Sequence, residues 1–115
     1  MASSPDPNAF LPLPHLAYQV LLSLAAGEAH GYAIAREVER RCAPEMRPST
    51  GSLYLAIGRL DANGLIREVG AEGRRTIYRL TALGRRVAEA EAARLQSLVE
   101  VAAARDLVRE PGSDR

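Results

Sequence analysis

Residues 50–80 read TGSLYLAIGRLDANGLIREVGAEGRRTIYRL, and the spacing of the apolar residues changes within this stretch. In its first half they recur every three or four positions, which is the period of one helix face. Ser49 or Thr50 is suited to cap the start of this helix, and Asn63-Gly64 provides the left-handed turn that ends it. The face that we expect to be buried consists of Leu53, Ala56, Ile57 and Leu60.

In the second half of the same stretch the apolar period falls to two, which is the period of a strand. Leu65 to Val69 and Arg75 to Leu80 are short runs of this kind. Between them, Gly70-Ala71-Glu72-Gly73 supplies two glycines for a turn. We therefore predict a β-hairpin directly after the helix.

Two further helices are expected before this stretch. Pro14 suits the first position of a helix over residues 14–25, because its fixed φ and missing N–H group cost nothing there. A second helix is expected over residues 31–42, and His30 is interpreted as a capping or hydrogen-bonding residue at the turn into it. Residues 43–48 contain two prolines and cannot be helical throughout.

The chain after the hairpin is predicted to form one long helix. Thr81 caps it, and no helix breaker follows before Pro111-Gly112, so we expect a helix over residues 82–109. At about 1.5 Å per residue this helix would be roughly 40 Å long, which is long for so small a domain. It carries an apolar stripe with alternating spacings of four and three residues, as a coiled coil does. The stripe consists of Ala88, Ala92, Leu95, Val99 and Ala102, with Leu98 alongside.

These elements predict a mainly α fold with a small β-hairpin: a winged helix-turn-helix followed by one long C-terminal dimerisation helix. We divide the chain into a flexible N-terminal arm at 1–12, a DNA-binding domain at 13–81, the dimerisation helix at 82–109 and a disordered tail at 110–115. A chain of 115 residues buries a smaller share of its surface than a large domain does. A single copy is therefore expected to be marginally stable, which favours an oligomer.

The charge is unevenly distributed along a chain whose net charge is only +1. Residues 36–86 hold eleven arginines against six acidic residues, a net charge of +5, whereas residues 1–35 and 87–115 carry −2 each. All fifteen cationic residues are arginine, whose planar side chain suits bidentate contacts with phosphate and guanine. In a winged helix the third helix enters the major groove and the hairpin reaches the neighbouring backbone. The sequence therefore predicts a protein that binds double-stranded DNA.

The residues expected at the DNA lie along the third helix and at the hairpin turn. Gly51 allows a phosphate to approach the free amides of the first helical turn. Arg59 lies two turns further along the outward face, and Arg74 and Arg75 lie at the turn of the hairpin. The full set of expected DNA contacts is Arg47, Ser49, Thr50, Gly51, Ser52, Tyr54, Leu55, Arg59, Arg74 and Arg75.

Other classes of protein find little support in the sequence. The single cysteine, Cys42, rules out a disulfide framework and a multi-cysteine metal site, and with only two histidines we expect neither a metal nor a cofactor. We expect no enzymatic activity, because no nucleophile–base arrangement and no phosphate-cradling glycine motif occurs. No apolar run is long enough to cross a bilayer and no export signal is evident, so we expect a cytoplasmic protein without a membrane partner. Cys42, Tyr32 and Tyr78 are all expected to be buried.

The same residues resemble the PadR family of transcriptional regulators over about residues 13–100. Each motif is weak alone, but together their order and spacing are specific. The motifs that carry the resemblance are Leu21-Leu22-Ser23-Leu24, His30-Gly31-Tyr32-Ala33-Ile34, Thr50-Gly51-Ser52-Leu53-Tyr54, Arg59-Leu60, Asn63-Gly64-Leu65-Ile66, Arg75, Tyr78-Arg79-Leu80-Thr81 and Gly84-Arg85. One residue departs from the family pattern: Leu55 stands where proline is frequent, and it is expected to alter base preference, for example through a thymine methyl group.

The resemblance implies a homodimer of the short subgroup, in which the single C-terminal helix packs against the first and last helices of the partner. It also implies repression by operator binding, with small-molecule inducers such as phenolic acids or drugs in some members. The expected dimer interface is Leu16, Val20, Ala88, Ala92, Leu95, Leu98, Val99 and Ala102. The candidate ligand cavity is lined by Tyr18, Gln19, Leu95 and Val99. The alternative is that these residues form ordinary dimer core. The chain contains no tryptophan on which a ligand could stack.

Two alternatives to a DNA-binding repressor stay open at this point. Winged helices also serve as protein-interaction modules, and fold alone does not decide between these uses. A ligand-binding sensor that does not read DNA directly is the other alternative.

Overall fold

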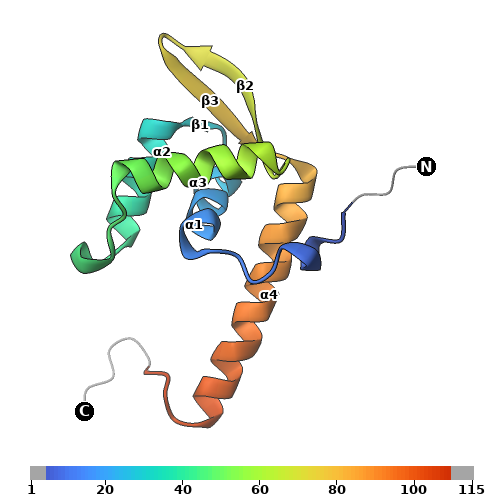
Figure 1. The fold of residues 1–115 in the computed structure, drawn as a ribbon. Helices are drawn as coiled ribbons and strands as arrows, with labels where there is room; N and C mark the ends of the chain where they lie inside the picture. Colours follow the sequence, from blue (N-terminus) through green and yellow to red (C-terminus); the bar gives the residue numbers. More distant parts are fainter. Residues whose placement is uncertain (1–4, 110–115) are drawn as a thin grey trace.

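The computed structural model describes residues 5–109 and shows a winged helix-turn-helix followed by one long helix (Figure 1). Helices α1, α2 and α3 precede a β-hairpin, and α4 follows it, which confirms the predicted fold class. The elements in chain order are η1 (Pro7–Phe10), α1 (His15–Ala25), β1 (Ala29–His30), α2 (Gly31–Arg41), η2 (Pro44–Met46), α3 (Thr50–Ala62), β2 (Ile66–Glu72), β3 (Arg75–Leu80) and α4 (Ala82–Ala104).

Helix α1 lies at the centre of the helical layer and contacts α2, α3 and α4. Its apolar side chains are buried against those of the other helices, and the predicted buried face of α3 is confirmed for Leu53, Ile57 and Leu60. Ala56 is only half-buried. From the other helices, the fully buried apolar residues are Val20, Leu21, Ile34, Val38 and Val87.

Side chains cap three of the helices. The Ser49 hydroxyl oxygen accepts a hydrogen bond from the Ser52 amide at 3.1 Å, so Ser49 and not Thr50 is the N-cap of α3. The Thr81 hydroxyl oxygen accepts from the Gly84 amide at 3.0 Å at the start of α4. His30 accepts through Nδ1 from the Ala33 amide at 3.1 Å, which confirms its predicted capping role for α2.

The sheet has three antiparallel strands in the order β1-β3-β2. Pairing in the hairpin continues as far as Glu72 and Arg75, so the connection is Gly73-Arg74 and not the predicted four residues Gly70 to Gly73. Gly73 has a φ of +63°, which the absence of a side chain permits. Strand β1 was not predicted, because two residues carry no recognisable period.

The prediction of a flexible arm at 1–12 is wrong for its second half. Residues Pro7–Phe10 form a 3₁₀ turn that lies against α4, and the Asp6 carboxylate accepts from the Asn8 amide at 3.0 Å to cap it. Phe10 and Leu11 pack against the hydrophobic core, which gives this segment the apolar burial that holds it in place. Residues 1–4 lie outside the described part of the chain.

Helix α4 ends at Ala104, five residues earlier than predicted. Asp106 adopts a left-handed φ of +61°, and the Leu107 amide donates back to the Ala102 carbonyl at 2.9 Å, which closes the helix without a glycine. The first turns of α4 pack on the core through Val87 and Ala88. Figure 1 shows the second half extending beyond the other helices. The predicted tail at 110–115 falls outside the described residues.

Within residues 5–109, no helix combines the length and the apolar composition that crossing a bilayer requires.

Candidate nucleic-acid interface

One long side of α3 is exposed. Its exposure follows from the 3.6-residue period, because the residues between the buried positions point away from α1. Tyr54 and Leu55 are large exposed side chains on this helix, so both are available to a partner. The exposed residues of α3 are Thr50, Gly51, Ser52, Tyr54, Leu55, Gly58, Arg59 and Ala62.

The hairpin forms a wing that projects away from the helices (Figure 1). Arg74 occupies the two-residue connection at its tip, and Arg75 is the first residue of β3. Both are exposed. The wing therefore carries two adjacent guanidinium groups at the place where the sequence predicted contacts with phosphate.

The wing and the helices enclose a pocket of about 310 Å³, called here the wing pocket. The structure brings three predicted DNA contacts together there, namely Tyr54 of α3 and Arg74 and Arg75 of the wing. The remaining lining residues are Gly31, Tyr32, Thr76 and Tyr78.

Tyr32 is exposed and not part of the core, contrary to prediction. Its relative exposure is 48%, whereas Tyr78 is half-buried and packs against the core as predicted. The Tyr32 ring lies below the guanidinium groups of Arg75 and Arg36, at 4.8 Å and 5.6 Å from the ring centroid. Helical geometry would have revealed the error, since a residue two before the buried Ile34 lies about 200° around the helix from it.

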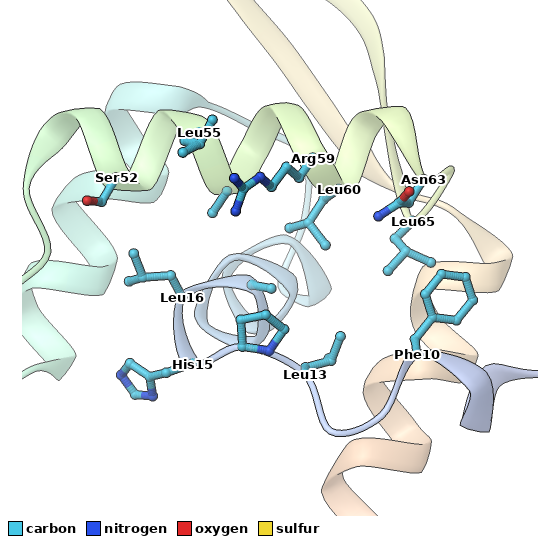
Figure 2. Close-up of a pocket in the computed structure, with 13 residues that line it drawn as sticks. Phe10, Leu13, His15, Leu16, Ser52, Leu55, Arg59, Leu60, Asn63 and Leu65 are labelled. Atoms are coloured by element: carbon cyan, nitrogen blue, oxygen red, sulfur yellow. The ribbon is translucent and has the colours of Figure 1, made fainter.

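Arg59 and Leu55 line a different, more apolar pocket of about 510 Å³, called here the α3 pocket (Figure 2). Figure 2 shows these two side chains on the α3 wall and Leu13, His15 and Leu16 on the opposite wall. The predicted DNA contacts are thus divided between two neighbourhoods, the wing pocket and the α3 pocket. Arg47 is exposed just before α3 and lines neither of them.

The arginines of the predicted interface differ in their partners from Arg41. Within residues 5–109, Arg47, Arg59, Arg74 and Arg75 form no ion pair with a carboxylate. By contrast, the Arg41 guanidinium donates to the side chain and the backbone carbonyl of Gln19, both at 2.8 Å. None of these four guanidinium groups is paired with a carboxylate in the described part of the chain, although Arg75 Nη1 lies 3.4 Å from His30 Nε2. The positive charge on this side of the molecule favours an anionic partner.

Arg41 instead ties α2 to α1. It also donates to Glu37 at 2.9 Å and to the Ser23 hydroxyl at 3.0 Å. Hydrogen bonds from Ser23 and Arg41 hold the pKa of the Glu37 carboxyl below its ordinary value. Cys42, at the end of α2, is half-buried and not buried as predicted. Its Sγ accepts a hydrogen bond from the side-chain Nε2 of Gln19 at 3.7 Å.

Of the residues predicted for the dimer interface, Val20 is 0% exposed within the single chain and lies in its hydrophobic core. Ala88 packs mainly against the core of its own chain. Leu98 and Val99 are 54% and 49% exposed, so the distal part of the predicted stripe is uncovered. Leu16, Leu95 and Ala102 are half-buried, and Ala92 is exposed.

The residues predicted for a ligand cavity between two subunits lie away from both pockets described above. Tyr18, Gln19, Leu95 and Val99 line neither the wing pocket nor the α3 pocket. Gln19 is engaged with Arg41 instead. Among residues 5–109, no group of three or more histidine, cysteine, aspartate or glutamate side chains is placed to hold a metal ion.

Comparisons with known proteins agree with the fold. The profile of the PadR-like family of transcriptional regulators matches residues 20–90. An uncharacterised 37.1 kDa protein in transposon Tn4556 of Streptomyces fradiae is 42% identical over 73 residues, which are 64% of this chain and 21% of that protein. The chain thus spans about a fifth of the length of that relative.

Solved structures of two regulators share the fold. A PadR family transcription regulator from Clostridium difficile superposes with a TM-score of 0.71 at 22% identity, over 78% of this chain and 96% of that one. A transcriptional regulator from Clostridium thermocellum superposes with a TM-score of 0.68 at 24% identity, over 95% of this chain and 100% of that one. Identities this low are evidence for the fold alone.

Proposed function

The chain belongs to the PadR-like family of transcriptional regulators, which are DNA-binding proteins and not enzymes, and on that premise we propose that it is a homodimeric repressor. In this proposal α3 of each copy enters a major groove and the wing contacts the adjacent backbone. The two half-sites of a pseudo-palindromic operator then lie about 34 Å apart, one turn of the duplex. The observation that carries the proposal is the set of four interface arginines without a carboxylate partner.

We assign the DNA contacts to the residues predicted from the sequence, with residues 13–81 as the DNA-binding domain. Arg74, Arg75, Tyr54 and the start of α3 are assigned to backbone phosphates. Arg59 and Leu55 are assigned to the groove, where their exposure leaves them free to reach base edges. A gel shift with the DNA upstream of the protein's own gene tests this proposal against a protein-interaction module, which would leave the DNA unshifted.

Replacing both Arg74 and Arg75 with alanine is expected to weaken binding to every duplex sequence. Each phosphate contact contributes about 0.9 to the slope of log K against log salt concentration, so losing two should lower that slope by nearly two. The measurement is fluorescence anisotropy across a salt series. Replacing the exposed Arg105 and Arg109, beyond the far end of α4, removes the same charge and serves as the control. An unchanged slope in the wing variant would exclude the wing from the interface.

We place the dimer contact on the distal part of α4, where Leu98 and Val99 are exposed. Apolar side chains at this spacing on a protruding helix are buried when a second helix packs beside them. A partner helix against Leu16 and the stripe would also cover part of the α3 pocket.

Replacing Leu98 and Val99 with glutamate is expected to convert the dimer to monomers, because four like charges would face one another across the helix pair. Size-exclusion chromatography with light scattering measures the mass. At about 100° per residue, Ser97 and Ala104 lie on the opposite side of α4, so S97E with A104E adds the same charge away from the stripe. If the stripe variant remains dimeric, the contact lies elsewhere.

Release by a small molecule is the least direct part of the proposal, and the α3 pocket is the feature that supports it. Its apolar walls and its single guanidinium, from Arg59, suit a small amphipathic acid. A ligand there would contact Arg59 and Leu55, which we assign to DNA. Thermal-shift screening of the purified protein against such acids tests both this and the ligand-sensor alternative.

A further inference from the structure

Every polar side chain that lines the wing pocket is a guanidinium, a hydroxyl or a phenol, and each of these can donate a hydrogen bond to an occupant. Arg74 and Arg75 supply guanidinium groups, Thr76 a hydroxyl, and three tyrosines their phenols. No carboxylate is among the residues that line it. Two acidic side chains of the wing lie outside the lining: the Glu72 carboxylate is 3.9 Å from His30 Nε2, and Glu68 pairs with Tyr78 across the hairpin. An anion therefore fits the chemistry of this pocket better than a neutral or cationic group.

The Arg75 guanidinium lies against the Tyr32 ring, and its Nη1 is also 3.4 Å from His30 Nε2. The group lies 4.8 Å from the centroid of the Tyr32 ring, a distance at which a cation is attracted to the face of the ring. Arg36, one turn further along α2, donates a hydrogen bond from Nη1 to the Tyr32 hydroxyl at 2.8 Å. Tyr32 is thus held from α2 while it supports a cation that belongs to the wing.

Gly31 fixes the position of the Tyr54 phenol. A Cβ atom at residue 31 would lie 2.5 Å from Tyr54 Cε1 and 2.9 Å from its hydroxyl, so glycine lets the ring lie directly over the start of α2. The ring belongs to α3 and its hydroxyl lies at the edge of the pocket. Three separate elements, α2, α3 and the wing, therefore each place a donor or a supporting ring around one space.

The third phenol, Tyr78, remains a donor at physiological pH. Burial raises its pKa above the ordinary value, and the nearby Glu68 carboxylate acts in the same direction. The hydroxyl therefore keeps its proton.

We propose that the wing pocket binds one backbone phosphate of the DNA duplex, with Tyr32 as the residue that positions Arg75 for this contact. The inference rests on the proposed DNA binding and adds a defined site to it. A pocket of about 310 Å³ accommodates a phosphate with its waters, and its place between the wing and α3 is where the backbone between groove and wing would pass. Positioning by Tyr32 reduces the rotamer freedom that Arg75 would otherwise lose on binding.

The test compares Tyr32→Leu, Tyr32→Phe, Arg75→Leu and the double variant Tyr32→Leu/Arg75→Leu on one duplex over a salt series. Tyr32→Leu removes the aromatic face and is expected to weaken binding about fivefold, with a salt slope lower by about one. Tyr32→Phe keeps the ring and should retain the wild-type slope. The double variant should bind no more weakly than Arg75→Leu, because both changes remove the same contact. Tyr32 is exposed, so circular dichroism should show all four variants folded.

The outcomes separate this inference from the function on which it rests. If Tyr32→Leu binds DNA with the wild-type slope, or if the losses from Tyr32→Leu and Arg75→Leu simply add, the positioning role is wrong while DNA binding stands. If the wild-type protein binds no duplex at low salt, the proposed function itself fails. A titration with inorganic phosphate, monitored through the amide resonances of Tyr32 and Thr76, tests whether the pocket binds a free phosphate ion and not a phosphate of the duplex. Saturation without any change in duplex affinity would overturn the assignment to DNA.

Discussion

Replacing Gly84 with alanine is expected to destabilise the protein more than any other single methyl group added to a helix. A Cβ atom at this position would lie 1.9 Å from the backbone oxygen of Leu65 and 2.9 Å from its carbonyl carbon. The Leu65 oxygen cannot withdraw easily, because it accepts from the Thr81 amide at 3.1 Å and from the Thr81 hydroxyl at 3.0 Å. The start of α4 would have to move off the core. We expect a loss of about 3 kcal/mol in the free energy of unfolding, the upper end of the usual cost of overpacking, because the clash is with backbone.

Thermal and urea denaturation measure this loss, which corresponds to a melting temperature lower by more than about 10 °C. Gly58→Ala is the matched control, since nothing lies within 4 Å of a Cβ at this interior position of α3. Alanine there should raise the free energy of unfolding by about 0.5–1 kcal/mol, because it reduces the conformational entropy of the unfolded chain. Equal effects from the two substitutions would show that α4 does not approach Leu65 as described.

The order of elements followed from the sequence because each helix and strand carries its own period and boundary signals. Ser49, Thr81 and His30 all cap the helices they were expected to cap. The errors fall where tertiary contacts decide. Phe10 looks like part of a polar, proline-rich arm, yet it is held by a core that only the folded chain assembles. Gly84 belongs to a recognisable motif, but only the structure shows what its missing side chain accommodates.

The candidate site was predictable to a similar degree. Arg74 and Arg75 are exposed on the wing as the charge pattern indicated. Tyr32 was expected in the core, although its helical angle places it on the outside of α2. The separation of Arg59 from the wing pocket could not be derived from the sequence, since it depends on how the N-terminal segment lies beside α3.

Glu91 holds that N-terminal segment in place. It is only 2% exposed, and its carboxylate accepts from Arg94 Nε at 2.6 Å, from Arg94 Nη2 at 3.0 Å and from the Leu13 amide at 3.0 Å. Leu13 precedes α1 and lines the α3 pocket. One carboxylate on α4 therefore joins the entry of the chain to the last helix, across 78 residues of sequence.

Replacing Glu91 with alanine should lower the free energy of unfolding by about 3 kcal/mol, the lower end of the range for breaking a buried pair. The lower end applies because the Arg94 guanidinium is partly exposed and can be hydrated in the variant. The remaining cost arises because the Leu13 amide loses its acceptor. Hydrogen exchange at Leu13 should accelerate together with the loss of stability. Glu89→Ala, at an exposed position on the same helix, should change the free energy of unfolding by less than about 0.5 kcal/mol.

Acid should reproduce part of this loss in the wild-type protein. The hydrogen bonds from Arg94, with that from Leu13, hold the pKa of Glu91 below its ordinary value despite burial. A carboxyl whose pKa is lower in the folded state stabilises fully above its unfolded pKa of about 4.3, and this stabilisation disappears as the pH falls through the folded value. Denaturation curves between pH 7 and pH 3 should therefore decline less steeply below about pH 4.3 for Glu91→Gln than for the wild type. Parallel curves would mean that Glu91 does not carry its charge in the folded protein.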